Sequence, residues 1–199
     1  IANLPFADNS FDGATSQFGF EYADMQASAK EIARVLNTNG HFQLLSHHKS
    51  SEIIRTASRR LKELSNISKH HLLNHTLSFI NNEISDNQLE IIGQQFLDSY
   101  QGQLTKEISG GVFNIINQCI DLKTNGKAAS SLRLYQEISN GIKGECSRLE
   151  QLVKVAMHQD AVESLIAIFK DCGSIASFEA LKTQDNLILA WKIQGTKSE

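Results

Sequence analysis

The sequence has 199 residues, of which 41% are hydrophobic and 21% are charged, and it contains a single proline. This composition is typical of a folded domain and excludes a linker or a disordered tail. Nineteen Lys and Arg residues are nearly balanced by 22 Asp and Glu residues, for a formal net charge of -3. Because binding to a phosphate backbone needs a basic surface and both signs are spread along this chain, we expect no nucleic-acid partner.

Two further features limit the class of protein. No apolar run approaches the roughly 18 residues of a membrane-spanning helix, and the start lacks the basic and apolar regions of a signal peptide. We therefore expect a soluble, cytoplasmic protein with no membrane partner. The three cysteines Cys119, Cys146 and Cys172 are widely spaced, which predicts reduced thiols and neither a disulfide framework nor a zinc site. Because the chain begins with Ile1 and a motif follows at once, we expect it to be part of a longer protein.

The first 48 residues predict a strand, a helix and a second strand. Residues 11–22 are rich in aromatic and small side chains and almost uncharged, as is typical of a strand buried on both faces and the loop at its end. Asp24 is expected to cap a helix that ends near residue 36, with Gly40 in the left-handed turn after it. The apolar run 41–46 predicts the second strand. This length is that of a right-handed parallel crossover unit.

The rest of the chain changes character twice. Residues 49–157 contain no proline and repeat apolar residues at spacings of three and four, which predicts several amphipathic helices. Breaks between the later helices are expected at Gly110–Gly111, Asn125–Gly126 and Gly141–Gly144. Residues 158–199 return to the first pattern, with a helix near 159–172 and then two β-rich runs typical of a hairpin.

These patterns predict an α/β protein in three segments. Residues 1–48 form the C-terminal half of an α/β core, residues 49–157 form a large inserted helical cap, and residues 158–199 supply the closing helix and an antiparallel β-hairpin. We expect the strands near 12–18 and 41–46 to be parallel neighbours. The hairpin is expected to join the same sheet.

Two sequence blocks resemble a known family. Residues 4–12, LPFADNSFD, and residues 30–40, KEIARVLNTNG, are similar to two motifs of the class I S-adenosylmethionine-dependent methyltransferases, and they lie at that family's spacing. The similarity is strong over residues 1–48 and weaker over 159–194. It implies a partial Rossmann-like methyltransferase sheet. One departure is that residues 37–40 read NTNG where the family typically has KPGG.

The resemblance implies S-adenosyl-L-methionine as the cofactor. It places Ile1 and Ala2, just before the first block, beside the adenine. It places Gln17 and Phe18 near the methionine portion, at the carboxyl end of the first strand, where open α/β sheets bind ligands. The family's glycine-rich loop and its ribose-binding acid do not occur in the sequence. We therefore expect the parent protein to be the methyltransferase, and this fragment alone to bind the cofactor poorly and to be inactive.

Candidate catalytic residues follow from position. His47 and His48 come directly after the second strand, and Glu21 and Tyr22 come after the first, so all four are expected at one edge of the sheet. A base among them would suit O- or N-methylation, although methyl transfer also proceeds by alignment alone. For His47 and His48, the role of ordinary loop histidines is the favoured interpretation. No metal site is expected, because His71 and His75 lack a third ligand in the same turn.

The leading hypothesis is therefore the C-terminal portion of a methyltransferase that acts on a small or lipophilic acceptor, with the helical segment closing over it. The alternative is a non-catalytic interaction or oligomerisation module derived from a methyltransferase fold. A third hypothesis, a regulatory ligand-binding domain, requires a pocket among the central helices. Because the family's first strands are missing, the strand at 11–18 would have an unpaired apolar edge, which predicts a homodimer or an edge filled by the same chain.

Overall fold

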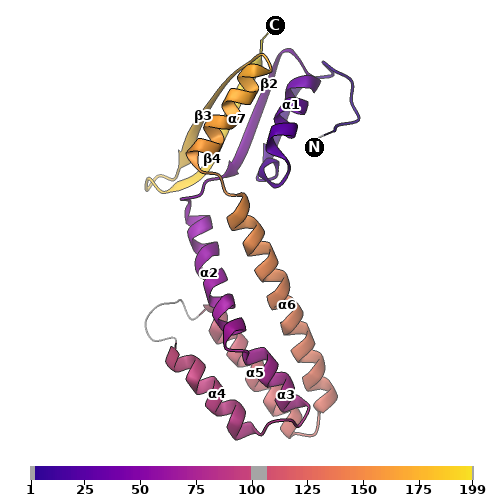
Figure 1. Ribbon diagram of the computed structural model, residues 1–199, viewed down its shortest axis with the longest axis vertical. Helices are drawn as coiled ribbons and strands as arrows, with labels where there is room; N and C mark the ends of the chain where they lie inside the picture. Colours follow the sequence, from indigo (N-terminus) through magenta and orange to yellow (C-terminus); the bar gives the residue numbers. More distant parts are fainter. Residues whose placement is uncertain (1–2, 100–106, 199) are drawn as a thin grey trace. The chain divides into compact units, whose positions relative to one another are not determined.

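The computed structural model describes residues 3–99 and 107–198. It divides into two compact units (Figure 1). The first, here called the α/β unit, comprises Ile1–Thr56 and Leu152–Glu199, and the second, the helical unit, comprises Ala57–Gln151. The α/β unit is therefore assembled from both ends of the chain. The assignment of residues 49–157 as an inserted cap stays a prediction.

The α/β unit contains one four-stranded sheet with the strand order β1-β2-β4-β3. Its strands are β1 (Phe11–Gln17), β2 (Leu36–His47), β3 (Ser174–Lys182) and β4 (Ile188–Lys197). β1 and β2 are parallel, whereas β4 runs antiparallel to both β2 and β3. This arrangement confirms the prediction of two parallel neighbours joined in one sheet by a C-terminal hairpin.

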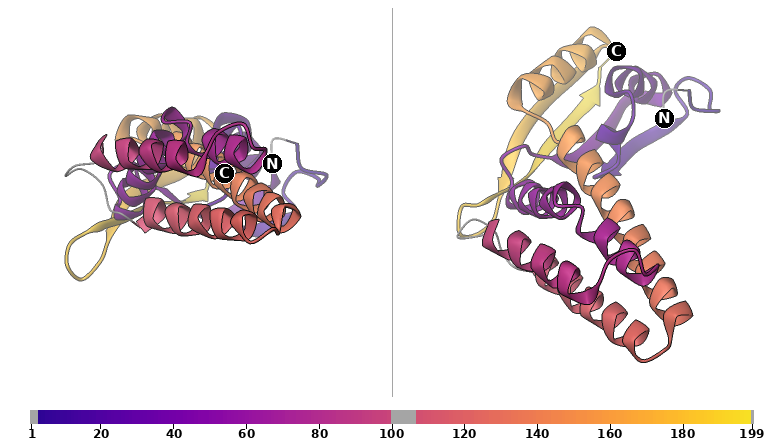
Figure 2. Two further views of the ribbon diagram at one scale, coloured as in Figure 1. Left: turned by 90° about the horizontal axis from the view of Figure 1, so that it is seen from below. Right: turned by 60° about the horizontal axis from the view of Figure 1, so that its bottom comes forward.

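Two helices cover one face of this sheet. They are α1 (Met25–Val35) and α7 (Gln159–Asp171), which lie side by side in both views (Figures 1 and 2). α1 begins at Asp24, whose carboxylate accepts a hydrogen bond of 3.1 Å from the Ala27 N–H and so satisfies a free donor of the first turn. Beneath the helices, the ring of Phe42 stacks on Phe169 with centroids 4.1 Å apart. The core of the unit therefore lies between this face and the two helices.

Among the described residues, no other element of the α/β unit covers the opposite face of the sheet. In β2, Phe42 and Leu44 are buried under the helices, whereas His41 and Gln43 alternate with them and are exposed. β1 has no fully buried residue, so the expectation of a strand buried on both faces is wrong. The physical reason is that β1 lies at the end of the strand order and carries a helix layer on one side alone.

The start of β2 contains an irregularity. β1 pairs Phe11 with Leu36 but Gly13 with His41, so β2 accommodates extra residues there. Asn39 has the positive φ, 65°, and Gly40 does not, so the left-handed position expected for Gly40 belongs to Asn39, whose short side chain tolerates it. Gly40 meets a different requirement, because an added Cβ would lie 2.8 Å from the Asn37 carbonyl oxygen.

The described residues of the central segment form five helices, which agrees with the prediction of several helices there. They are α2 (Glu52–Lys69), α3 (Leu72–Ile80), α4 (Asp86–Ser99), α5 (Glu107–Thr124) and α6 (Ala128–Val155). α5 ends where predicted, with Gly126 at φ 75°. The other two predicted breaks are wrong, since Gly110–Gly111 lie inside α5 and Gly141–Gly144 lie inside α6. A glycine costs a helix about 1 kcal/mol, which tertiary packing readily offsets.

The sequence-based expectations on thiols and membrane spans also have a structural counterpart. All three cysteines are free, and Cys119 is buried. Within residues 3–99 and 107–198, no helix combines the length and the apolar character that crossing a membrane requires.

Candidate functional site

The loop that leads into β1 is held by one arginine of α1. The Arg34 guanidinium contacts Glu31 at 2.8 Å and Asp8 at 2.6 Å, and it donates to the carbonyl oxygens of Leu4 and Phe6. The hydrogen bond from Arg34, together with that from the Leu4 N–H, lowers the pKa of Glu31 to about 2. These motif residues therefore fix the loop against α1 and present no free functional group.

The chain turns sharply at the carboxyl end of β1. Phe18 takes a positive φ of 53°, and its N–H donates to the Leu45 carbonyl at 2.8 Å. The Ser16 hydroxyl accepts a bond of 3.1 Å from the Phe20 N–H. These bonds direct the backbone into a short 3-10 helix, η1 (Phe20–Tyr22). As a result, η1 lies beside the end of β2.

Glu21 and His47 form a buried pair at this edge. The His47 Nδ1 lies 2.7 Å from Glu21 Oε1, and the His47 backbone N–H donates to the same oxygen at 3.0 Å. The Glu21 side chain is fully buried. Burial raises its pKa, but the hydrogen bonds from His47 and from the Glu21 backbone outweigh that effect, so the pKa lies below its ordinary value. Glu21 is therefore a carboxylate at neutral pH.

Two aromatic rings border this pair. The ring centroids of Phe18 and His47 are 4.7 Å apart, and the Tyr22 ring meets that of His47 edge-on at 6.3 Å. Phe18 is 39% and Tyr22 47% exposed, although large aromatic side chains are usually more buried. The edge therefore presents a buried acid–base pair beside two accessible aromatic rings.

His48 has a different environment from His47. Its ring stacks on Trp191 with centroids 4.2 Å apart, and its Nδ1 accepts a 2.9 Å hydrogen bond from the Ser50 N–H. The indole N–H of Trp191 donates to the Met157 carbonyl at 3.0 Å. Burial, and secondarily repulsion from His158, lowers the pKa of His48. His48 and Trp191 thus belong to the packing that joins β2 and β4.

The residues expected to contact a cofactor are only partly described. Ile1 and Ala2 lie outside the described residues. Gln17 is exposed at the last position of β1, and Phe18 follows it. The two described residues therefore lie at the same edge as Glu21 and His47, and their predicted role in binding stays a prediction.

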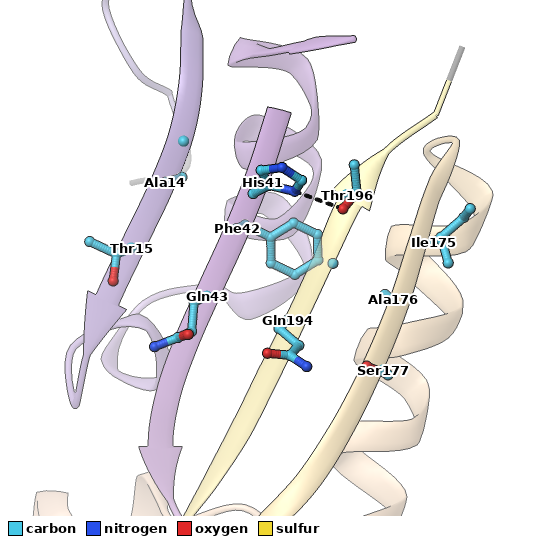
Figure 3. Close-up of a pocket in the computed structure, with 12 residues that line it drawn as sticks. Ala14, Thr15, His41, Phe42, Gln43, Ile175, Ala176, Ser177, Gln194 and Thr196 are labelled. Carbon is cyan, nitrogen blue, oxygen red and sulfur yellow. Dashed lines mark hydrogen bonds between the residues drawn. The ribbon is translucent and has the colours of Figure 1, made fainter. Parts of the chain in front are cut away.

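A separate hollow lies on the sheet itself. A depression of about 590 Å³ follows the uncovered face of the sheet (Figure 3). Gln43 and Gln194 project from neighbouring strands there, and His41 bonds to Thr196 at 2.8 Å. None of the candidate residues lines this depression. Its lining contains no Asp, Glu, Lys or Arg, and its one imidazole, His41, is bonded to a threonine, so the chemistry favours the edge with Glu21 and His47 as the functional site.

The sequence placed Glu21, Tyr22, His47 and His48 at one edge, and they do lie there. It missed that Glu21 and His47 pair with each other and that His48 turns away to Trp191. The sequence could predict that these residues share an edge, because the carboxyl ends of adjacent parallel strands lie at the same edge of a sheet. The positive φ of Phe18 brings Glu21 close to His47, and it could not be predicted from the residue type.

Comparisons with known proteins agree with the first sequence block. A family model described as a methyltransferase domain matches residues 1–44. A protein of Corynebacterium kroppenstedtii, named demethylmenaquinone methyltransferase, is 54% identical over 39 residues, which are 19% of this chain and 17% of that protein. The chain thus matches less than a fifth of the length of this relative.

A solved structure also aligns with the chain. It is the YcgJ protein of Bacillus subtilis, which is 15% identical, with the alignment covering 100% of this chain and 68% of that one. The TM-score is 0.29, a likeness too low to support a conclusion.

Proposed function

We propose that this chain is the C-terminal portion of an S-adenosyl-L-methionine-dependent methyltransferase that acts on a small or lipophilic acceptor, because residues 1–44 match a methyltransferase domain model and a stretch of 39 residues is similar to a methyltransferase. The observation that carries the proposal is the coincidence of the matched segment with β1, α1 and β2, the parallel unit whose carboxyl edge holds Glu21 and His47. Ligands of open α/β sheets bind at such an edge.

The residues at this edge fit the cationic part of the cofactor. Glu21 places a buried carboxylate behind this edge, and its negative charge favours a cationic ligand in front of it. The exposed ring of Phe18 offers a face to a cation, and Gln17 adds an exposed amide. When bound, the cofactor would supply an electrophilic methyl group. This chain's residues would orient the methionine portion and exclude water from one side of it.

The rest of the cofactor site is proposed to come from preceding polypeptide. Within the described ranges, β1 is followed by the single Gly19 and by η1, and none of the strands leads into a glycine-rich turn that opens a helix. A phosphate- or ribose-binding turn of that kind is the usual second half of such a site. On this basis the isolated chain is an incomplete binding site.

Calorimetry on two proteins tests the proposal. The 199-residue chain should show no saturable heat with S-adenosyl-L-methionine at millimolar concentration, whereas the chain extended by its upstream coding sequence should bind it and transfer a labelled methyl group to a small acceptor. Micromolar binding by the 199-residue chain would show that the cofactor site is misplaced. An extended protein that neither binds nor transfers would contradict the enzymatic function itself.

The unpaired edge of β1 favours a second role, the non-catalytic one. Among the described residues β1 pairs with β2 alone, and Phe6 and Phe11 are large apolar side chains exposed beside it. Unpaired strand edges readily add a strand from another chain, and we propose a second copy of this chain as the occupant. Light scattering at tens of micromolar should show a dimer that Phe11→Lys converts to monomer. A monomeric unsubstituted chain would contradict this role.

A further inference from the structure

The pairing of Glu21 with His47 determines which ring nitrogen is free. Since the Glu21 carboxylate only accepts, the His47 Nδ1 at 2.7 Å must carry the hydrogen. The neutral ring therefore keeps its lone pair on Nε2, for which no hydrogen-bond partner exists among the described residues. A histidine whose tautomer is set by a buried carboxylate has the arrangement of a general base.

The burial of Glu21 adds an electrostatic reason. Its side chain is fully buried whereas that of His47 is 10% exposed, so the carboxylate acts on the ring through a medium of low dielectric constant. Its negative charge stabilises the positive charge that the ring acquires when Nε2 takes a proton. Among the described residues, Glu21 and Tyr22 are the titratable groups facing the ring from η1, and β4 places the apolar Ala190 opposite His47.

The rings beside the pair indicate the shape of the acceptor. Phe18 and Tyr22 both contact His47 and both remain exposed. Flat apolar surfaces of this kind bind planar groups. Phenols and enols are planar acceptors whose dissociable proton is on a hydroxyl oxygen, the atom that an O-methylation would modify.

From this geometry we propose that His47 Nε2 is the general base that removes the hydroxyl proton of a phenol-type acceptor lying against Phe18 and Tyr22, with Glu21 as its positioning residue. In this step the acceptor O–H bond breaks, an N–H bond forms at Nε2, and the electron pair stays on the acceptor oxygen. The oxygen becomes the nucleophile and the imidazolium holds the proton beside Glu21. The inference rests on the proposed methyltransferase function, for which it specifies the acceptor class.

Two other histidines, His48 and His41, lack the carboxylate partner that His47 has. The His48 Nδ1 is already an acceptor for Ser50 and its ring is covered by Trp191, so it is not available to a ligand. His41 is exposed on the same strand, with Nδ1 bonded to Thr196. His41→Gln is therefore a matched control that removes an imidazole from β2 without touching the pair.

A first measurement needs no cofactor. Nitrogen NMR of the histidine-labelled 199-residue chain should show the neutral His47 ring protonated at Nδ1, and Glu21→Gln should change this tautomer balance. A neutral ring protonated at Nε2 would overturn the proposal.

A second measurement uses 4-nitrophenol, whose ionised form absorbs visible light. The unsubstituted chain and His41→Gln should both produce a saturable rise in phenolate absorbance at a pH where the free phenol is mostly protonated. His47→Gln should abolish the rise, and Glu21→Gln should move it to higher pH. No saturable rise in the unsubstituted chain, or an equal rise in His47→Gln with native circular dichroism, would overturn the proposal.

The extended protein separates this inference from the proposed function. If it transfers methyl groups, His47→Gln should lower kcat by about 10²- to 10⁴-fold, the usual contribution of a general base, and should remove the acidic limb of the pH profile. Normal transfer by His47→Gln would refute the inference and leave the function standing. Absence of transfer by the unsubstituted protein would refute the function, while the nitrophenol and NMR results would still decide the role of the pair.

Discussion

The two units of this molecule differ in the range over which their side chains interact. In the α/β unit, Glu21 bonds to His47 across 26 residues, and Lys197 donates to the Leu36 carbonyl across 161. In the helical unit many side-chain bonds stay within one helical turn, such as Arg148 with Glu145 and Thr76 with the Leu72 carbonyl. Side chains are therefore positioned by distant neighbours in the first unit and largely by their own helix in the second.

The glycines show the same difference. An added Cβ at Gly195 of β4 would lie 2.6 Å from the Ile175 carbonyl oxygen and 2.7 Å from the Phe42 ring, whereas at Gly141 of α6 it would meet nothing within 4 Å. The lesson is that the unit carrying the candidate site tolerates little change, and the helices tolerate more. The one tryptophan, Trp191, lies in the α/β unit, so its fluorescence reports on that unit, while far-UV circular dichroism reports mainly on the helices.

The largest expected effect comes from removing one buried ring in each unit. Phe169 and Phe96 are both fully buried. Replacing either with alanine should lower the free energy of unfolding of its own unit by about 3–5 kcal/mol, because a cavity remains. Phe169→Ala should shift the urea transition seen by Trp191 fluorescence, and Phe96→Ala the transition seen by circular dichroism. Equal shifts of both probes in both variants would show that the two units unfold as one cooperative unit, which would contradict the difference between them.

A smaller effect of opposite sign is expected at the two glycines. Gly195→Ala should lower the free energy of unfolding by about 1–3 kcal/mol, since the methyl group overpacks a site bounded by backbone. Gly141→Ala should raise it by about 0.5–1 kcal/mol, because alanine restricts the unfolded chain and favours the helix. Urea unfolding followed by the two probes checks both signs. A stabilising Gly195→Ala would mean that Phe42 moves away at no cost.

The smallest effect is a dependence on pH. The folded-state pKa of Glu31 is lowered to about 2 from 4.5, so its contribution to stability is present above pH 4.5 and is lost as the pH falls toward 2. Glu31→Gln should therefore flatten the loss of α/β-unit stability over this range in the fluorescence-detected transition. Glu145→Gln, which removes the lowered-pKa partner of Arg148 in α6, should leave that transition unchanged. An unaltered pH profile for Glu31→Gln would show that other groups cause the loss of stability of the α/β unit in acid.

Much of the α/β unit could be predicted because its local patterns agree with its tertiary structure. The apolar run that became β2, the capping Asp24 and the closing hairpin each have a local signature. The arginine of the second sequence block, Arg34, binds both an acid and carbonyl oxygens of the first block. Local signals suffice wherever the nearest neighbours along the chain also decide the conformation.

The errors fall where distant neighbours decide. The residue types of β1 could not show that it lies at the end of the strand order with one face uncovered. Gly110 and Gly141 look like helix breaks, yet they continue their helices. The pair of Glu21 and His47 depends on a backbone turn at Phe18, which has a positive φ. A phenylalanine in the sequence does not predict such a turn. Position at a common edge was predictable, and hydrogen-bond partners were not.

The discontinuity of the α/β unit has a consequence for biosynthesis. β2 ends at His47, but its neighbour β4 begins only at Ile188, and the whole of the helical unit lies between them. During translation the helical unit is complete once Gln151 has left the ribosome, so it can fold while half of the sheet has not been made. Until then β2 has β1 as its sole available strand partner, and its apolar residues Phe42 and Leu44 lack α7. We expect nascent-chain chaperones to engage this protein at β2 and to release it when β4 emerges.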